Sequence, residues 1–224
     1  GSAKAVVLNS GNANACTGEE GLANARRMCG LTADMLGLDV AEVLVCSTGV
    51  IGVQLPMEAI ETGIPQAAKV LSGKGGKDAA EAIMTTDTVP KTFAVEVEIA
   101  GVKVRIGGMA KGSGMIAPNM ATMLSVITTD ADIAPELLRK QLGLAVRRSF
   151  NCITVDGDMS TNDTVIVLAN GASGAPAIEG SGEAADDFYA GLEMVCRELA
   201  RLIARDGEGA TKLVSIRVNG AGNE

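Results

Sequence analysis

The middle of the chain contains the pattern that most restricts the possible folds. The runs "KTFAVEVEI" (91–99) and "VKVRIGG" (102–108) alternate polar and apolar residues on either side of Ala100-Gly101. Such alternation is typical of strands with one buried face, and two runs joined by a short turn are typical of an antiparallel hairpin. The fold therefore contains an antiparallel pair of strands, which a purely parallel sheet does not provide.

The rest of the chain alternates between helix-like and strand-like segments. Apolar residues at helical spacing predict helices within 22–37, 55–71, 78–86, 134–150 and 180–207. We expect Gly63 and Pro65 to break or kink the second of these helices. Apolar runs predict further strands within 4–9, 42–52, 122–129, 151–157, 163–171 and 211–220. Because strands occur both in a hairpin and between helices, the prediction is a mixed α/β protein whose sheets are covered by helices.

Composition decides what the core is made of and which partners are excluded. Hydrophobic residues make up 47% of the 224 residues but aromatic residues only 2%, so aliphatic side chains and Met must fill the core. The longest predicted helix carries on its apolar side Phe188, Leu192, Val195, Leu199 and Ile203. A net charge of −8 with few aromatic residues argues against nucleic acid as a partner. No apolar stretch reaches the ~18 residues of a membrane span, so no membrane partner is expected.

Cysteine and histidine usage narrows the chemistry. The cysteines, Cys16, Cys29, Cys46, Cys152 and Cys196, are odd in number and form no C-x-x-C pair. We therefore expect reduced thiols, no metal site and a cytoplasmic protein. The chain has no histidine, which excludes a Ser-His-Asp triad and a Cys-His dyad. Any nucleophile in this chain needs another base.

Five loops rich in Gly, Asx and Thr stand at strand or helix ends, where functional groups are often carried on a rigid scaffold. They are 9–18, 46–52, 110–122, 156–163 and 205–212. An ordinary turn is the better interpretation of each one alone, but five such loops in one chain weaken that interpretation. Two segments resemble a phosphate loop and a calcium loop but lack residues that these sites require. "GKGGKD" lacks the Ser or Thr that follows Lys in a phosphate loop, and "DGDMSTND" lacks the Gly and Glu of a calcium loop.

Thr122 is a candidate nucleophile because it follows a glycine-rich loop that ends in Ala121. A threonine can act as a nucleophile when its own N-terminal amine is the base. Attack of Thr122 Oγ on the carbonyl of Ala121 would cut the chain and create that amine. The glycines Gly112 and Gly114 would allow the strained geometry that this step needs. The alternative is a threonine that only favours the strand it begins.

Six motifs in one order resemble a known family. "NSGNANACTG" (9–18), "STGVIG" (47–52), "IMTTDTVPK" (83–91), "KGSGMIAPNMATMLS" (111–125), "SFNCITVDGDMSTND" (149–163) and "RDGEGATK" (205–212) resemble the ornithine acetyltransferases, which are bifunctional glutamate N-acetyltransferases of arginine biosynthesis. The resemblance spans nearly the whole chain. It implies an αββα sandwich of mixed sheets faced by helices.

The resemblance also implies an activity and assigns residues to it. The chain would cleave itself between Ala121 and Thr122, and Thr122 would carry an acetyl ester during ping-pong transfer from N-acetylornithine to glutamate. Thr48 and Gly49 correspond to the oxyanion hole. Thr88, Lys111 and Glu208 correspond to substrate-binding positions, although a loop lysine is otherwise usually solvated. No cofactor is implied, acetyl-CoA is a possible second substrate, and the assembly is a heterotetramer of two α and two β chains.

Two departures from the family pattern leave alternatives open. Met159 stands where the family usually has Thr, and family members extend beyond both ends of this chain, including a C-terminal Asn and a Ser or Thr that bind substrate. We expect residues 1–224 to form one catalytic-core domain across the 121/122 junction. The alternatives are a self-cleaving Thr amidase or aminopeptidase of the same fold, and a trimmed or designed core that neither cleaves nor catalyses.

Overall fold

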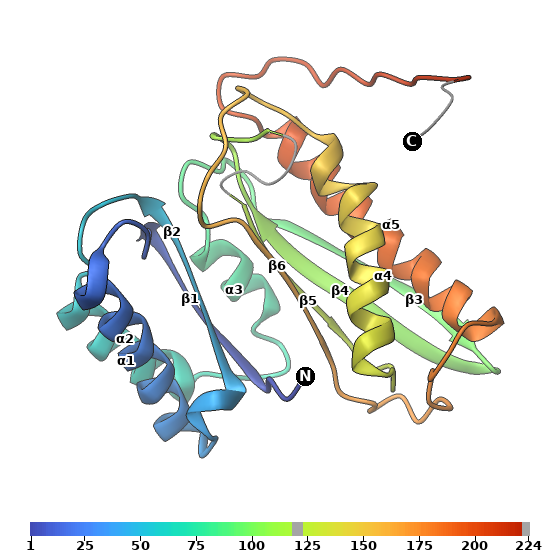
Figure 1. The fold of residues 1–224 in the computed structure, drawn as a ribbon, viewed down its shortest axis with the longest axis horizontal. Helices are drawn as coiled ribbons and strands as arrows, with labels where there is room; N and C mark the ends of the chain where they lie inside the picture. The colour runs from blue at the N-terminus through green and yellow to red at the C-terminus, as the bar shows by residue number, and fades with distance from the viewer. Residues whose placement is uncertain (118–122, 221–224) are drawn as a thin grey trace.

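The computed structural model describes residues 1–117 and 123–220, which form two β-sheets between two layers of helices (Figure 1). In chain order the elements are β1 (Ala5–Asn12), α1 (Gly18–Leu36), the 3-10 helix η1 (Val40–Glu42), β2 (Val43–Val50), α2 (Met57–Lys69), α3 (Gly76–Ala82), β3 (Lys91–Ile99), β4 (Val102–Lys111), β5 (Leu124–Thr129), α4 (Pro135–Arg147), the 3-10 helix η2 (Phe150–Cys152), β6 (Thr164–Ala169) and α5 (Glu183–Arg205).

The first sheet consists of the parallel strands β1 and β2, whose register runs from Ala5 opposite Val43 to Gly11 opposite Gly49. Helices α1 and α2 cover its outer face (Figure 1). A small buried cluster holds this layer together and contains Met28, Leu55, Ile60 and Ile64. Parallel pairing brings the carboxyl ends of both strands to the same edge, where the loops 9–18 and 46–52 begin.

The second sheet has the strand order β3-β4-β5-β6 and is mixed. β3, β4 and β5 pair antiparallel, and β6 is parallel to β5. Ala100 and Gly101 both have positive φ, 51° and 80°, as a two-residue hairpin turn requires. The hairpin predicted from the alternation of residues 91–108 is therefore confirmed.

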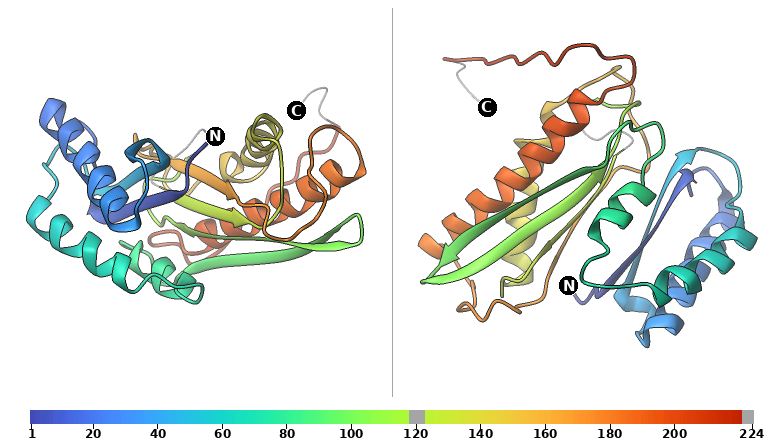
Figure 2. Two further views of the ribbon diagram at one scale, coloured as in Figure 1. Left: turned by 90° about the horizontal axis from the view of Figure 1, so that it is seen from below. Right: turned by 180° about the vertical axis from the view of Figure 1, so that it is seen from behind.

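The main core lies between this second sheet and the helices α4 and α5. The five apolar residues predicted for the longest helix are all fully buried there. Gly191 allows α5 to lie close to the sheet, because a Cβ at this position would stand only 2.7 Å from Val97 Cγ1. Figure 2 shows α5 lying along β3 and β4.

The layers follow the predicted αββα order: α1 and α2, the β1-β2 sheet, the second sheet, then α4 and α5 (Figures 1 and 2). Helix α3 lies between the sheets and contacts β3 and β4. Ser10 Oγ at the end of β1 donates to Ala82 O at the end of α3, at 2.9 Å. This bond ties the first sheet to the helix that packs on the second.

Two predicted strands are absent from the described part of the chain. Residues 151–157 begin inside η2 and continue as an irregular segment, in which Val155 N donates to Ile116 O. The segment 211–220 is extended but forms no ladder, and Val214, Ile216 and Val218 are 75%, 85% and 76% exposed. An alternating or apolar pattern makes a strand only where a partner edge lies beside it, and no described strand lies beside either segment.

Two element boundaries also differ from the prediction. Of the break or kink predicted at Gly63 and Pro65, the break is absent, because helix α2 continues to Lys69. Ile60 and Ile64 are buried on the turn before the proline. Strand β5 begins at Leu124 and not at Thr122. Residues 118–122, which include Pro118, Ala121 and Thr122, lie outside the described residues.

The packing of α5 gives a matched pair of substitutions on one helix. Leu192 is fully buried, whereas Met194 is 52% exposed. We expect Leu192→Ala to lower the free energy of unfolding by about 2–5 kcal/mol because it leaves a cavity against the sheet. Met194→Ala should change it by less than about 0.5 kcal/mol. Urea denaturation of both variants measures the difference, and equal losses would contradict the placement of this helix.

Candidate active site

The loops singled out in the sequence gather at one end of the two sheets (Figure 1). Asn162 joins three of them. Its Nδ2 donates to Asn14 Oδ1 at 2.7 Å and to Ser47 O at 3.1 Å. The loop that precedes β6 is thereby attached to the carboxyl ends of β1 and β2, so the two sheets share this end of the molecule.

The glycine loop after β4 is held from two sides. The carboxylate of Asp156 accepts hydrogen bonds from the backbone amides of Met115, at 2.6 Å, and Ile116, at 2.9 Å. The backbone carbonyl of Ser113 accepts from the Glu208 amide at 2.7 Å. All five loops predicted to carry function are therefore connected by hydrogen bonds.

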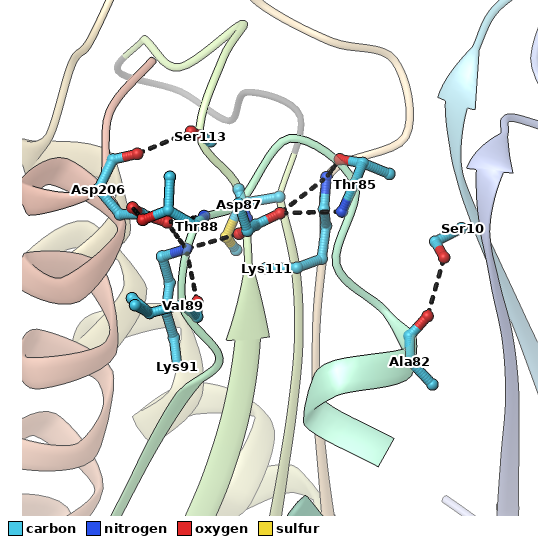
Figure 3. Close-up of polar contacts among 12 residues, drawn as sticks. Ser10, Ala82, Thr85, Asp87, Thr88, Val89, Lys91, Lys111, Ser113 and Asp206 are labelled. Atoms are coloured by element: carbon cyan, nitrogen blue, oxygen red, sulfur yellow. Dashed lines mark hydrogen bonds and ion pairs between the residues drawn. The ribbon is translucent and has the colours of Figure 1, made fainter. Parts of the chain in front are cut away.

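A buried ion cluster lies beneath these loops (Figure 3). The ammonium of Lys91, with a side-chain exposure of 0%, is 2.6 Å from both Asp87 Oδ1 and Asp206 Oδ2. Burial alone would raise the pKa of Asp87, but hydrogen bonds from the Gly112 amide and Lys91 hold it below its ordinary value. Lys91 and the backbone and hydroxyl of Thr88 likewise keep the pKa of Asp206 low against the effect of burial. Both carboxyl groups are therefore ionised at neutral pH.

Lys111 is not the solvated loop lysine that its neighbours in sequence suggest. It is the last residue of β4 and its side chain is 2% exposed. Its Nζ donates to Thr85 Oγ1 at 2.8 Å and lies 4.0 Å from Asp87 Oδ2 (Figure 3). Burial lowers the pKa of Lys111, and the charge of Asp87 acts in the opposite direction. A ligand carboxylate that met this ammonium would do so largely away from water, where charge–charge attraction is strong.

Thr88 and Glu208 are both exposed. The hydroxyl of Thr88 donates to Asp206 Oδ1, and its backbone amide donates to Asp206 Oδ2 at 2.9 Å. The carboxylate of Glu208 passes so close to Gly114 that a Cβ there would lie 2.3 Å from Glu208 Oε2. Gly114 therefore makes room for Glu208, whereas the sequence analysis assigned this glycine only to loop flexibility.

Thr48 and Gly49 stand at the end of β2, opposite Ser10 and Gly11 of β1. Gly49 has φ of 129°, and a Cβ on it would lie 2.2 Å from the Gly11 carbonyl carbon. Only glycine fits such an approach of two backbones. Thr48 is 1% exposed, and its hydroxyl has no hydrogen-bond partner among the described residues. A buried hydroxyl without a partner is unusual enough to need an explanation.

Met123, the first described residue after the predicted cleavage junction, is held at both its backbone amide and its carbonyl, whereas Ala121 and Thr122 lie outside the described residues. The Met123 amide donates to Asp163 Oδ1 at 2.7 Å, and the Met123 carbonyl accepts from the Thr164 amide at 3.1 Å. Asp163 thus fixes the first described residue after the junction.

Asp163 is also the most perturbed carboxyl group near this junction. Burial raises its pKa to about 7, against the opposing effects of the Met123 amide and the Lys111 charge. Its Oδ2 has no hydrogen-bond partner in the part of the chain that the structure describes. The group therefore changes its protonation state near neutral pH beside the loop that carries the predicted nucleophile.

The predicted site residues fall into two connected groups. Thr88, Lys111 and Glu208 are linked through the ion cluster and Ser113. Through the described residues, Thr48 and Gly49 connect to that group indirectly, by way of Ser47 and Asn162. Whether the two groups converge on Thr122 stays a prediction, because that residue is outside the described ranges.

Sequence reasoning missed the buried charges. Lys91 and Asp87 belong to the motif "TTDTVPK", but no role was predicted for either residue. The sequence did indicate the burial of Lys91, because Lys91, Phe93 and Val95 are alternate residues of one strand and so share its apolar face. A lysine on the apolar face of a strand must be buried and paired or must escape to the edge.

The thiols agree with the prediction. All five cysteines are free, and burial raises the pKa of Cys46 to about 11 and that of Cys196 to about 12. Within residues 1–117 and 123–220 no group of three or more acidic, Cys or His side chains is arranged to hold a metal ion. The same ranges contain no helix that is long and apolar enough to cross a membrane.

Comparison with known proteins connects this geometry to one family. The family model described as "ArgJ family" matches residues 1–224. The "Arginine biosynthesis bifunctional protein ArgJ" of Symbiobacterium thermophilum is 58% identical over 221 residues, which are 99% of this chain and 55% of that protein. The protein of the same name from Caldanaerobacter subterraneus is 54% identical over 224 residues, 100% of this chain and 56% of that protein. The chain thus spans about half the length of the curated relatives it matches.

Solved structures give more limited matches. An arginine biosynthesis bifunctional protein from Bacillus halodurans is 46% identical, with a TM-score of 0.48 over 52% of this chain and 61% of that one. An ornithine acetyltransferase from Mycobacterium tuberculosis, solved with ornithine, is 39% identical, with a TM-score of 0.43 over 51% of this chain and 61% of that one.

The raised pKa of Asp163 predicts a pH-dependent stability. Because its folded value of about 7 exceeds the ordinary aspartate value of ~3.9, the stabilisation is complete below pH ~4 and is lost as pH rises through 7. Asp163→Asn stays neutral and keeps an oxygen for the Met123 amide. We expect the melting temperature of the variant, relative to wild type, to fall steadily as pH is lowered from 8 to 4.

Asp158→Asn is the matched control for this measurement, since Asp158 is an exposed carboxylate of the same loop. Its melting temperature relative to wild type should vary little with pH. A constant difference for Asp163→Asn across the same range would show that Asp163 does not titrate as described.

Proposed function

Because the chain belongs to the ArgJ family, we propose that it carries the catalytic core of an acetyltransferase of arginine biosynthesis, which moves an acetyl group from N-acetylornithine to glutamate. The observation that carries this proposal is the joining of all five motif loops, far apart in sequence, at one end of the two sheets. The reaction is assigned to the full gene product that contains residues 1–224.

The first step is self-cleavage at the 121/122 junction. Thr122 Oγ attacks the carbonyl carbon of Ala121, and the amide nitrogen of Thr122 leaves and takes up a proton. Water then hydrolyses the ester between the two residues. The products are an α chain that ends in the Ala121 carboxylate and a β chain that begins with the free amine of Thr122.

The second step is acetyl transfer through Thr122. The new amine accepts the hydroxyl proton as Thr122 Oγ attacks the acetyl carbon of N-acetylornithine. The amide bond breaks, the proton passes to the departing ornithine nitrogen, and an acetyl ester remains on Thr122. The amine of glutamate then attacks this ester, and Thr122 regains its proton as N-acetylglutamate leaves. This route needs neither histidine nor a cofactor.

Thr48 and Gly49 serve the oxyanion that forms in both steps. The buried hydroxyl of Thr48, without a partner among the described residues, supports this role because it is a donor kept free of other acceptors. Gly49 supports the same role because its close approach to Gly11 leaves no room for a side chain, so its backbone at the strand end stays uncovered by a side chain of its own. Preorganised donors of this kind lower the barrier most strongly where water is excluded.

Substrate binding falls to Thr88, Lys111 and Glu208. The buried ammonium of Lys111 suits a substrate carboxylate, and the exposed Glu208 suits a substrate ammonium. Both N-acetylornithine and glutamate carry an α-carboxylate, so one cation can serve both half-reactions. Acetyl-CoA is a possible second acetyl donor. The active assembly would be a cytoplasmic heterotetramer of two α and two β chains, with residues 1–224 as one domain across the junction.

Intact mass and a transfer assay on the full gene product test the proposal together. We expect two chains separated at 121/122 and N-acetylglutamate formed with parallel-line ping-pong kinetics. Thr122→Ala should remain one chain and be inactive, whereas Thr122→Ser keeps a hydroxyl and should still be cleaved. Hydrolysis of N-acetylornithine without transfer to glutamate would indicate the amidase alternative, and cleavage of Thr122→Ala would identify another nucleophile.

A second prediction separates Thr48 from its neighbour. Thr48→Val keeps the shape of the side chain but removes the hydroxyl, and should lower kcat by about 100- to 1,000-fold if it is an oxyanion donor. Ser47 is also buried with an unpartnered hydroxyl, but successive side chains of a strand point to opposite faces. Ser47→Ala should therefore change kcat less than about threefold, since only one face of the strand meets the reacting group. Similar losses in both variants would remove the special role of Thr48.

A further inference from the structure

The ion cluster under the site has no part in the reaction as proposed so far, yet it touches two of the expected substrate-binding residues. The side chain of Lys91 is completely buried and does not reach solvent. Each of its two carboxylate partners contacts one of those two residues (Figure 3). Asp206 holds the hydroxyl of Thr88, and Asp87 lies beside the ammonium of Lys111.

The charges within the cluster balance only if Lys91 is present. Two cations, Lys91 and Lys111, face two carboxylates, Asp87 and Asp206. Lys91 lies at 2.6 Å from each carboxylate, whereas Lys111 remains at 4.0 Å from Asp87. Without Lys91, the nearest remaining cation for Asp87 is Lys111, which would be drawn into an internal ion pair and away from a ligand.

The hydrogen bonds also determine whether the hydroxyl of Thr88 can donate to a ligand or only accept from it. A hydroxyl has one proton to donate, and Thr88 gives it to Asp206, whose pKa is held low. Toward a ligand the oxygen of Thr88 can then only accept. It is therefore matched to a substrate N–H, such as an amide or an ammonium, while Lys111 is matched to a carboxylate.

We propose that Lys91 is a positioning residue that aligns Thr88 through Asp206 and keeps Lys111 only loosely paired with Asp87, so that the site recognises a substrate with an N–H group and a carboxylate. The inference rests on the proposed acetyltransferase function. Lys91 acts on the substrate only through these neighbours.

A double-mutant cycle in the full gene product tests this role. Lys91→Met should raise the KM for N-acetylornithine about tenfold and change kcat less than about threefold, since contacting residues couple by amounts of this order. In a Thr88→Val background, where the hydroxyl that Lys91 aligns is absent, the same substitution should raise KM by a clearly smaller factor, which is the part that Lys91 exerts through Lys111. Lys103→Met, at an exposed lysine of β4, is the control and should leave both constants unchanged.

A companion variant keeps the test decisive if Lys91→Met does not fold. Lys91→Met with Asp206→Asn removes one cation and one anion together, so the buried charges stay balanced. It should show a similar rise in KM and, in the Thr88→Val background, a similarly smaller rise. Circular dichroism and intact mass confirm that each variant is folded and processed.

The outcomes for the two proposals are distinct. Absence of transfer by the wild-type protein would overturn the proposed function. With wild-type transfer present, equal rises in KM with and without the Thr88 hydroxyl would show that Lys91 is merely structural. A fall in kcat at unchanged KM would likewise overturn the positioning role.

Discussion

The ammonium of Lys91 is the point on which the architecture of the site depends. It lies at the start of β3, and its partners come from the loop before β3 and from the end of α5. Asp87 extends the connection to the Gly112 amide at the exit of β4. An isolated buried charge is costly, and removing one partner of a buried ion pair typically costs about 3–5 kcal/mol. The three chain segments that present Thr88, Lys111 and Glu208 therefore hold one another in place.

The sequence predicted those parts of the fold that local pattern determines. The alternation of residues 91–108 predicted the hairpin, and the helical spacing predicted five of the residues that α5 buries. The failures share one cause. The segment 211–220 has the pattern of a strand but no described strand pairs with it, and the break considered at Pro65 is absent from a helix that buries Ile60 and Ile64 before the proline. Tertiary contacts decided both cases, and a single sequence does not display them.

The candidate site was predictable in its loops but not in its electrostatics. Dense Gly, Asx and Thr residues identified the segments that gather at one end, and the resemblance supplied roles for individual residues. The burial of Lys111 and the raised pKa of Asp163 arise from neighbours far away in sequence, such as Asp87 and Met123. Only Lys91 gave a local indication, because it occupies an apolar position of an alternating strand.

The position of Asp206 has a consequence for motion. It caps the carboxyl end of α5, where the helix dipole is negative and a carboxylate is normally unfavourable. The ammonium of Lys91 compensates both the Asp206 carboxylate and the negative end of the helix dipole. Fraying of the last turn is ordinarily the easiest local unfolding event in a helix. Here it would take the Asp206 carboxylate away from the buried ammonium of Lys91. The end of the longest helix and the first residue of β3 should therefore open as one cooperative unit. The part of the site that Asp206 and Lys91 form is then more rigid than its position at a helix terminus suggests.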